Sequence, residues 1–196
     1  SQKFMIKAII FDWAGVIGAD GYWVWLRKNI RDLESRRDYF QDISEKVDSA
    51  EMLHADFEKK LADISGKSAI EVWQEVKREI VINRELVGII EKLKSRYKIG
   101  LLSNFTYPWL NEILSENNLY KLFDAYIISS EHNVIKPNPD AFKKILNLLN
   151  VNAGESVFVD DRQVHVDAAN KIGLNGLLYK DNIQLVHDLG QLGIEV

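Results

Sequence analysis

Six polar residues of the chain could carry chemistry, and each of them follows a short apolar segment. In chain order they are Asp12, Ser103, Asn104, Lys136, Asp160 and Asp161. A carboxylate can attack an electrophile or bind a divalent cation, and a lysine can neutralise an anion. A hydroxyl and an amide can donate hydrogen bonds to the same anion. This set of groups suits the transfer of a phosphoryl group.

The acidic residues divide into a candidate nucleophile and candidate metal ligands. Asp12 is the candidate nucleophile, which would attack phosphorus and form an aspartyl-phosphate. Because a carboxylate and a phosphate dianion repel each other, the attack requires a cation between them, and Mg²⁺ prefers oxygen ligands. We predict Asp161 as a direct ligand and Asp160 as a ligand through water or as an orienting group. Asp12 and the backbone carbonyl of Ala14 would complete the protein ligands.

The other three residues are candidates for binding the phosphate. Lys136 would place a second positive charge against the phosphoryl oxygens, and Pro137 biases it towards an extended backbone. Ser103 and Asn104 would donate hydrogen bonds to the same oxygens and stabilise charge where it develops. Each residue alone also has an ordinary explanation, as a helix cap, a turn residue or a solvated surface lysine. Their shared position after apolar segments is what favours a site.

Five apolar segments rich in β-forming residues are the predicted strands. They cover residues 4–11, 99–102, 125–128, 156–159 and 176–179. Helical patterns lie between the later segments, and Asn138 and Pro139 suit an N-cap and first position of the helix that follows Lys136. Alternation of strand and helix predicts an α/β fold with a Rossmann-like, three-layer parallel sheet. Ligands bind at the carboxyl ends of the strands of such a sheet, where the polar residues lie.

The segment 19–82 has a different pattern. Its apolar residues recur at helical spacing, and the residues between them are heavily charged. This predicts about four amphipathic helices inserted after the first strand, and a helix at 85–96 that returns the chain to the sheet. We therefore predict a core of residues 1–18 and 83–196 and a helical cap of residues 19–82.

The tryptophans and histidines have less specific signals. Trp23 and Trp25 are two positions apart and cannot share a helix face, so one is expected in a core while the other could line a pocket. Trp73 is predicted to lie in the core of the cap. The histidines lack metal-ligand spacing, and His132, four residues before Lys136, has the strongest claim to a catalytic role.

The composition excludes several classes of protein. The chain has 196 residues, with 25 Lys and Arg against 29 Asp and Glu, which argues against a dedicated nucleic-acid-binding protein. The absence of cysteine excludes disulfides, thiol catalysis and cysteine-ligated metals. Lys7 and Asp12 interrupt the most apolar N-terminal stretch, so we expect no signal peptide or membrane span and a cytoplasmic location. The composition gives no indication of the oligomeric state.

Four motifs in this order resemble those of a known family. They are IIFDWAGVI around Asp12, LLSN ending at Asn104, IKPNPDAF starting at Ile135 and VFVDDR ending at Arg162. The chain resembles the haloacid dehalogenase-like (HAD) hydrolase superfamily along essentially its whole length. The resemblance implies a Rossmann-like core with a helical cap, Asp12 as the nucleophile and Mg²⁺ as the cofactor. Since most relatives are phosphatases, it also implies a small phosphorylated metabolite as the substrate.

One position departs from the pattern of this superfamily. Most of its phosphatases carry an aspartate two residues after the nucleophile, which donates a proton to the leaving group, whereas this chain has Ala14. A positioned acid or base contributes roughly 10²–10⁴-fold in rate. The short cap and the Asp-Asp-Arg stretch are similar to those of bacterial glucose-1-phosphate phosphatases, which also lack this aspartate. 2-Haloacid dehalogenases lack it too, but they work without the metal that Asp160 and Asp161 suggest.

Three functions follow from this pattern. The first is a Mg²⁺-dependent phosphatase that acts through an aspartyl-phosphate. The second is a C–P bond hydrolase, because Asp12-Trp13-Ala14-Gly15 resembles the first motif of phosphonoacetaldehyde hydrolases, which form a Schiff base with a cap lysine. The lysines of the cap include those at 28, 46, 59, 60 and 67. The third is a weakly active phosphate-binding relative, which a pocket without room for a phosphoryl group beside Asp12 would favour.

Overall fold

Five strands form one parallel sheet at the centre of the molecule. The structure is a computed structural model that describes residues 5–196. The strands are β1 (Ala8–Phe11), β2 (Lys98–Ser103), β3 (Ala125–Ile128), β4 (Ser156–Asp160) and β5 (Asn175–Leu178), and their order in the sheet is β3-β2-β1-β4-β5. The central strand β1 pairs with β2 and β4, with Phe11 opposite Leu101 and Val159. This arrangement confirms the predicted α/β fold with a parallel sheet.

The first strand is shorter than the sequence predicted. Phe4, the predicted first residue, lies outside the described residues, and Met5 is 80% exposed. The backbone of Lys7 already donates to Glu155 and accepts from Lys98, but the strand itself begins at Ala8. An apolar pattern cannot show where a strand leaves the protection of its neighbours, which is why the predicted strand also included the described residues 5–7.

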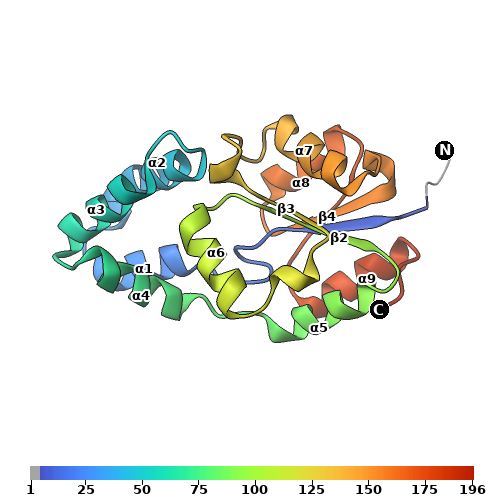
Figure 1. The fold of residues 1–196 in the computed structure, drawn as a ribbon, viewed down its shortest axis with the longest axis horizontal. Coiled ribbons are helices and arrows are strands. Elements are labelled where there is room, and N and C mark those ends of the chain that lie inside the picture. The colour runs from blue at the N-terminus through green and yellow to red at the C-terminus, as the bar shows by residue number, and fades with distance from the viewer. Residues whose placement is uncertain (1–4) are drawn as a thin grey trace.

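Helices cover both faces of the sheet (Figure 1). One face carries α7 (Pro139–Leu149) and α8 (Gln163–Lys171), and the other carries α5 (Arg84–Leu93), α6 (Tyr107–Glu116) and α9 (Asn182–Gln191). Ile10 of β1 belongs to the apolar cluster under α7, whereas Ile9 and Phe11 belong to the cluster under α5 and α6. Since successive strand residues point to opposite faces, a strand covered on both sides is apolar throughout. The three layers confirm the Rossmann-like architecture.

Side-chain caps start several of these helices, and the cap of α7 is the one that the sequence predicted. The side chain of Asn138 accepts a hydrogen bond from the N–H of Asp140, and Pro139 occupies the first position of α7. The side chain of Asn83 accepts from the N–H of Leu86 at the start of α5. These caps satisfy backbone donors that have no partner within the helix. α7 therefore begins directly after Lys136 and its loop.

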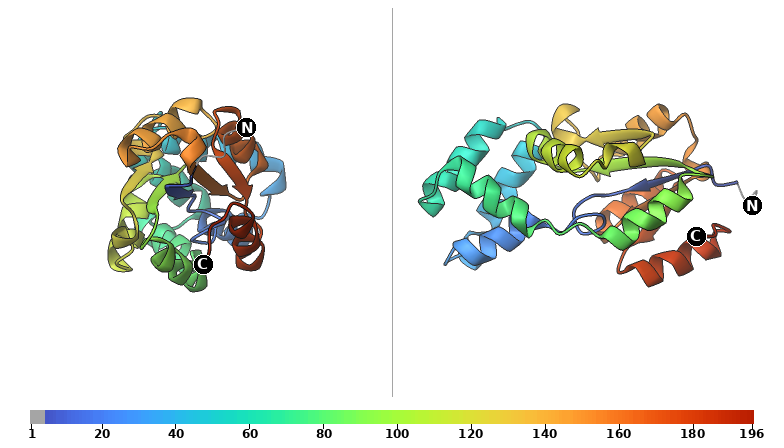
Figure 2. Two further views of the ribbon diagram at one scale, coloured as in Figure 1. Left: turned by 90° about the vertical axis from the view of Figure 1, so that its right-hand side faces the viewer. Right: turned by 60° about the horizontal axis from the view of Figure 1, so that its bottom comes forward.

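A second group of helices follows β1 at one end of the molecule (Figures 1 and 2). These cap helices are α1 (Gly21–Asn29), α2 (Arg37–Asp48), α3 (His54–Ser65) and α4 (Ala69–Glu79), and a short 3₁₀ helix, Glu34–Arg36, precedes α2. Their inward residues are buried at the spacing that the sequence indicated, among them Leu26, Leu61 and Val76. Amphipathic helices of this kind gain most of their stability from that shared apolar face.

The two segments that join the cap helices to the sheet lie side by side. Gly18 and Ile82 form an antiparallel bridge. The N–H of Ala19 donates to Val81 at 2.9 Å, and the N–H of Asn83 donates to Ile17 at 2.8 Å. This pairing falls at the predicted limits of the cap, and it supports residues 19–82 as a proposed unit.

The cap helices also contact the sheet-covering helix α6. The rings of Trp73 and Trp109 stack at 4.7 Å between centroids, and Trp73 donates a hydrogen bond to Glu112. Lys77 pairs with Glu112 at 2.6 Å and with Glu116 at 2.9 Å. The prediction that Trp73 lies in the core of the cap is wrong, because its ring is half-buried against α6. Periodicity identified its inward face but not which neighbour that face would meet.

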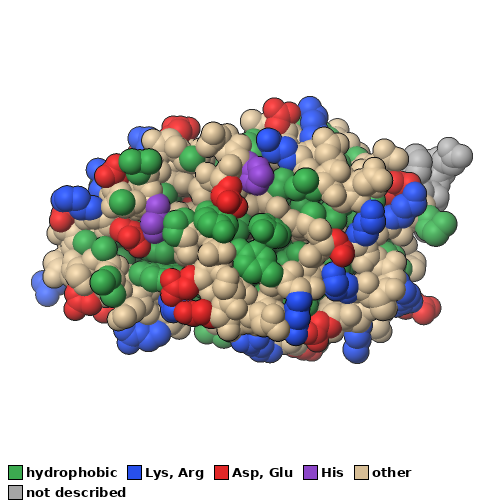
Figure 3. All heavy atoms as spheres, viewed as in Figure 1, with side chains coloured by type: hydrophobic (Ala, Val, Ile, Leu, Met, Phe, Trp, Pro, Cys, Tyr) green, Lys and Arg blue, Asp and Glu red, His purple; other side chains and the backbone are tan. Residues whose placement is uncertain are grey.

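Charges are mixed over the visible surface. On the face shown in Figure 3, acidic and basic side chains are interspersed over the cap helices and the sheet-covering helices alike. Within residues 5–196, none of the helices has both the length and the apolar character that crossing a bilayer requires.

Candidate active site

Three carboxylates meet where β1 and β4 end. Asp12 directly follows β1, and its N–H donates to the carbonyl of Val159 in β4 at 2.9 Å. One carboxylate oxygen from each of Asp12, Asp160 and Asp161 lies within 4.8 Å of the other two. The parallel register of the two strands therefore brings together residues that are about 150 positions apart in the sequence.

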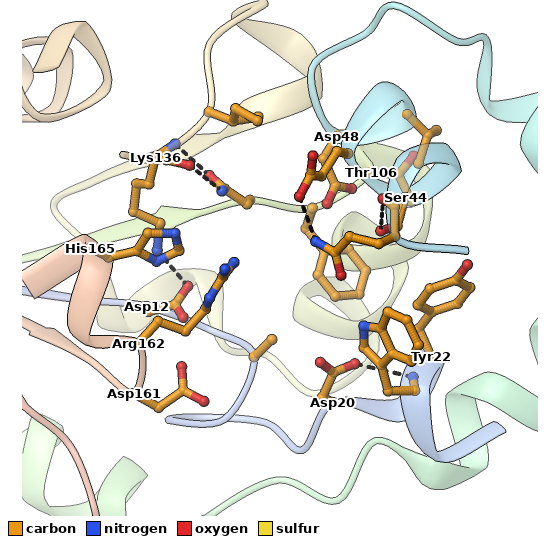
Figure 4. A pocket seen from close by; sticks show the side chains of 18 of the residues that line it. Asp12, Asp20, Tyr22, Ser44, Asp48, Thr106, Lys136, Asp161, Arg162 and His165 are labelled. Atoms are coloured by element: carbon orange, nitrogen blue, oxygen red, sulfur yellow. Dashed lines mark hydrogen bonds and ion pairs between the residues drawn. The ribbon is translucent and has the colours of Figure 1, made fainter. Parts of the chain in front are cut away.

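Lys136 joins two of these carboxylates. Its Nζ lies 2.8 Å from Oδ1 of Asp12 and 2.7 Å from Oδ2 of Asp160. The lysine side chain is fully buried, with its ammonium over the ring of Phe158. Figure 4 shows it reaching from the loop after β3 towards Asp12. A buried lysine is retained as a cation only where opposite charges compensate the loss of water, and these two carboxylates do so.

Asn104 holds the backbone of Lys136 in place. Its Nδ2 donates to the Lys136 carbonyl at 2.9 Å, and its Oδ1 accepts from the Lys136 N–H at 2.8 Å. Asn104 also lines the cavity above the carboxylates. Its predicted contact with phosphate stays a prediction, and the structure adds a positioning role that the sequence did not indicate.

Ser103 lies deeper than its neighbour. Its hydroxyl is buried and finds no hydrogen-bond partner among the described residues. It is not among the residues that line the cavity. Its predicted role in binding phosphate also stays a prediction.

His165 joins the site although the sequence gave it no role. It lies in the first turn of α8, is 3% exposed, and places Nδ1 3.0 Å from Oδ2 of Asp160. The sequence favoured His132, which lies outside the cavity lining. The usable signal was the position of His165, since a residue in the first helical turn after a strand that ends in Asp160 stays close to that strand end.

The carboxylates carry more negative charge than their surroundings compensate. Burial raises the pKa of Asp12 to about 7, although Lys136 opposes this shift. Burial and the charge of Asp160 raise the pKa of Asp161 to about 6. Burial also opposes ionisation of Asp160, but Lys136 and the hydrogen bond with His165 outweigh it and hold its pKa below the usual range. When all three are ionised, Lys136 leaves an excess of two negative charges.

A divalent cation fits this set of groups. Its charge equals the excess on the carboxylates, and Mg²⁺ prefers such oxygen ligands. Gly15 has a φ of +79°, and a Cβ there would lie 2.2 Å from Oδ2 of Asp161, so glycine permits the close approach of that carboxylate. In the described chain no backbone N–H donates to the carbonyl of Ala14, the other predicted ligand. The residues present therefore suit Mg²⁺.

A cavity of about 510 Å³ opens above these groups. Its core wall includes Asp12, Ala14, Asn104, Lys136, Asp161, Arg162 and His165. Its cap wall includes Asp20, Tyr22, Trp23, Arg37, Gln41, Ser44, Glu45, Val47, Asp48 and Phe57. Trp23 lines the cavity while Trp25 is buried among the cap helices, as the sequence predicted for one residue of that pair. The volume leaves room for a phosphoryl group and a small organic group beside Asp12.

The cap lysines lie away from the cavity. Five of them pair with carboxylates elsewhere; the pairs are Lys28–Glu79, Lys46–Asp42, Lys59–Asp63, Lys67–Glu75 and Lys77–Glu112. Of the lysines in residues 5–196, Lys136 is the one that lines the cavity. A Schiff base with a cap lysine, which the C–P hydrolase alternative requires, therefore has no candidate residue here.

Comparison with known proteins assigns the family. The family model for haloacid dehalogenase-like hydrolases matches residues 6–173. The chain belongs to this family. The match includes all four strand-end positions that supply the core wall of the cavity.

Curated relatives of this HAD-like hydrolase include phosphatases. A sesquiterpene phosphatase from Aspergillus oryzae is 25% identical over 108 residues, which is 55% of each chain. A D-ribitol-5-phosphate phosphatase from Bacteroides thetaiotaomicron is 25% identical over 186 residues, covering 86% of this chain and 89% of the relative. The chain thus spans about half the length of the first relative, and 37% of the length of another curated match.

Solved structures share the fold of this HAD-like hydrolase. A HAD family enzyme from Bacteroides thetaiotaomicron, in complex with magnesium and inorganic phosphate, superposes with a TM-score of 0.77 at 20% identity. The superposition covers 92% of this chain and 98% of that one. The two chains therefore share their architecture from the sheet to the cap helices.

Proposed function

We propose that this HAD-like hydrolase is a Mg²⁺-dependent phosphatase that removes phosphate from a small phosphorylated metabolite through an aspartyl-phosphate on Asp12. The observation that carries the proposal is the position of Lys136, whose Nζ bridges Asp12 and Asp160 at 2.8 Å and 2.7 Å beneath an open cavity. The phosphatases among its relatives support the same reaction class.

Asp12 supplies the nucleophile and Lys136 the positive charge. An oxygen of Asp12 forms a bond to phosphorus while the bond from phosphorus to the alcohol oxygen breaks, and the departing oxygen takes up a proton. Water then attacks the phosphorus of the aspartyl-phosphate, which releases inorganic phosphate and restores Asp12. Lys136, held by Asp160 and by the amide of Asn104, keeps its charge beside the transferring group without having to move.

Asp12, Asp161 and the carbonyl of Ala14 would hold the metal, and Asp160 would act through water or as an orienting group. Mg²⁺ supplies charge neutralisation on the phosphoryl oxygens when it is bound. His165 contacts Asp160 at 3.0 Å and fixes the direction in which that carboxylate points. Partners of this kind are worth roughly 10- to 100-fold in metal affinity or activity.

Position 14 supplies no acid. The methyl group of Ala14 lines the cavity where most phosphatases of this family have a carboxyl group, so the leaving oxygen receives its proton from another donor. Phosphate esters whose alcohols are stable as anions depend least on that proton. We therefore expect aryl phosphates to react faster than alkyl phosphates.

Release of inorganic phosphate from a panel of phosphomonoesters tests the proposal. The panel is assayed with Mg²⁺ and with EDTA, and phosphonoacetaldehyde is included. We expect turnover of at least one ester that EDTA abolishes and that returns with added Mg²⁺. Turnover confined to phosphonoacetaldehyde, or activity indifferent to EDTA, would overturn it.

A further inference from the structure

Three carboxylates of the cap wall line the cavity: Glu45, which accepts a hydrogen bond from Gln41, and the two residues Asp20 and Asp48. Asp20 immediately precedes α1, and Asp48 is the last residue of α2. Both line the cavity, and Figure 4 shows them facing the space that separates them from Asp12 and Lys136. A phosphate ester held at Asp12 therefore directs its organic part towards these two side chains.

Asp48 is half-buried and lacks, within residues 5–196, the hydrogen-bond donors that such carboxylates normally find, whereas Asp20 is exposed. Among the described residues, no group forms a hydrogen bond or ion pair with the side chain of Asp48. Asp20 accepts one hydrogen bond, from the N–H of Trp23 at 3.3 Å, which leaves its second oxygen free. Burial, and next the charge of Asp20, raise the pKa of Asp48 well above its ordinary value. The described part of the protein therefore provides no partner for the carboxylate oxygens of Asp48 or for the second oxygen of Asp20. A ligand could provide these partners.

The nearby cation on the cap wall is engaged elsewhere. The guanidinium of Arg37 stacks on the ring of Trp23 at 4.9 Å from its centroid. It lies 3.8 Å from Glu34, and its side chain is 56% exposed. Arg37 therefore points to the rim of the cavity, and it does not neutralise Asp48.

Aromatic rings form the surface between the two walls. Trp23 and Phe57 belong to the cap wall, and Phe105 and Trp109 line the side of the cavity near α6. The hydroxyl of Tyr22 already donates to the carbonyl of Phe40 at 3.0 Å. Rings accept the C–H surface of a carbon chain, and the acceptors beyond them accept donors placed along or at the end of that chain.

We propose that the substrate is a phosphomonoester whose organic part carries hydrogen-bond donors, hydroxyl or ammonium, and no second anionic group, and that Asp48 with Asp20 selects it. This inference rests on the proposed phosphatase function. A carboxylate on the substrate would meet Asp20 and Asp48 across the cavity and be repelled by them. Hydroxyl or ammonium groups instead satisfy the free oxygens of both residues.

Alkyl phosphates that differ in one terminal group test this selection. At two chain lengths, two and four carbons, the terminal group is methyl, hydroxyl, ammonium or carboxylate. We expect kcat/KM of the native enzyme for the hydroxyl or ammonium ester to exceed that for the carboxylate ester by about 10-fold or more at one of the lengths. The better of the two donor esters identifies which donor the site takes.

Asp48→Asn is the decisive variant. It keeps the size of the side chain, and we expect it to reduce the discrimination against the carboxylate ester about 10-fold while the methyl ester changes little. Asp20→Asn provides a second test, because asparagine caps a helix as well as aspartate does. Asp42→Asn, on the exposed side of α2, is the matched control and should leave all ratios unchanged.

Two negative results are distinguishable. If no ester, phenyl phosphate included, releases phosphate in a Mg²⁺-dependent manner, the phosphatase function fails and this inference falls with it. If phenyl phosphate is hydrolysed but the carboxylate ester equals the donor esters, or Asp48→Asn leaves their ratio unchanged, the phosphatase function stands and the selection by Asp48 is wrong.

Discussion

The two walls of the cavity treat charge in opposite ways. On the core side, Lys136 pairs with Asp12 and Asp160, and His165 contacts Asp160 as well. On the cap wall, Asp48 has no partner among the described residues. The core side is arranged for a group that every substrate shares, the phosphoryl group. The cap wall leaves its acceptors open for the part in which substrates differ.

The walls also differ in what fixes their side chains. Asp12 and Asp160 are placed by strand register, and Lys136 by two hydrogen bonds to Asn104. Asp20 and Asp48 stand at the ends of helices, whose positions depend on packing within the cap. A rigid sheet edge suits chemistry that tolerates little displacement, whereas helix ends can be rearranged without disturbing that chemistry.

Asp12→Asn tests whether the core wall alone carries the chemistry, and it should have the largest effect. Without the nucleophilic carboxylate we expect turnover of every substrate to fall by about 10⁴-fold or more, because no other group can form the covalent intermediate. Phosphate release measures this, and circular dichroism checks the fold. Asp167→Asn makes the same chemical change at an exposed residue of α8 and should be fully active. Substantial activity in a clean preparation of Asp12→Asn would exclude Asp12 as the nucleophile.

Lys136→Met tests the pairing that distinguishes the core side from the cap wall. Removing one cation from transition-state stabilisation should lower kcat by about 10²–10³-fold. It also leaves Asp12 and Asp160 buried without their partner, at a cost of about 3–5 kcal/mol in the free energy of unfolding. Phosphate release and urea denaturation give the two values.

Lys143→Met is the control for that variant. Lys143 pairs with Asp140 on the surface of α7, where both side chains are more than half exposed, so its loss should change stability by less than about 1 kcal/mol. Equal losses of stability in the two variants would mean that the buried ion pairs of Lys136 contribute no more than the exposed pair of Lys143.

Ala14→Asp should raise activity where the leaving group is poor. A carboxylic acid at this position would protonate the departing oxygen, and we expect a gain of about 10- to 100-fold for alkyl phosphates and less for phenyl phosphate. The ratio of kcat for the two classes is the measurement. Ala14→Asn matches the size without the acid and should give no gain. A gain from both variants would point to a change in shape rather than to proton transfer.

The metal-free protein should lose stability as the pH rises from about 4 to about 7. The pKa of Asp12 is raised to about 7 and that of Asp161 to about 6, so the folded state holds protons that the unfolded state has released. A raised carboxyl pKa therefore costs stability above the ordinary pKa, and Asp20 and Asp48 act in the same direction. The pKa of His165 is lowered instead. Its contribution to stability therefore rises with pH near the ordinary pKa of histidine and opposes the effect of the carboxylates.

Urea denaturation in EDTA at pH 4.5 and at pH 7.5 measures this difference, which we expect to be a few kcal/mol. Added Mg²⁺ should restore stability at pH 7.5, by about 2.7 kcal/mol at 100 times its dissociation constant. Asp161→Asn should flatten the pH dependence in EDTA. Stability that stays constant in EDTA, or that Mg²⁺ leaves unchanged, would contradict the account of the core side as a cation site.

The core side could be predicted because strand ends are local signals. An apolar run that stops at Asp12, or at Asp160 and Asp161, places those residues at the carboxyl edge of the sheet. This inference does not depend on the rest of the sequence. The same rule placed Lys136 at this edge, because it lies in the loop after β3. His165 was missed although its position in the first turn after β4 was a usable signal, because the histidines were judged by metal-ligand spacing and by distance along the chain from Lys136.

The cap wall could not be predicted in the same way. Periodicity showed which face of each cap helix is buried, and it separated Trp23 from Trp25. It did not show that Asp20 and Asp48 share one cavity, because that depends on how α1 and α2 pack. Helix packing that the sequence does not show also explains the position of Trp73, whose ring packs on α6 and not on the other cap helices.

The paired segments between the cap helices and the sheet have a kinetic consequence. Backbone hydrogen bonds between Ala19 and Val81 and between Asn83 and Ile17 hold these segments together, and the ion pairs of Lys77 with Glu112 and Glu116 attach α4 to α6 beside them. Those ion pairs are partly exposed, and dissolved ions screen them. We therefore expect the rate of product release to rise with ionic strength wherever opening of the cap limits turnover.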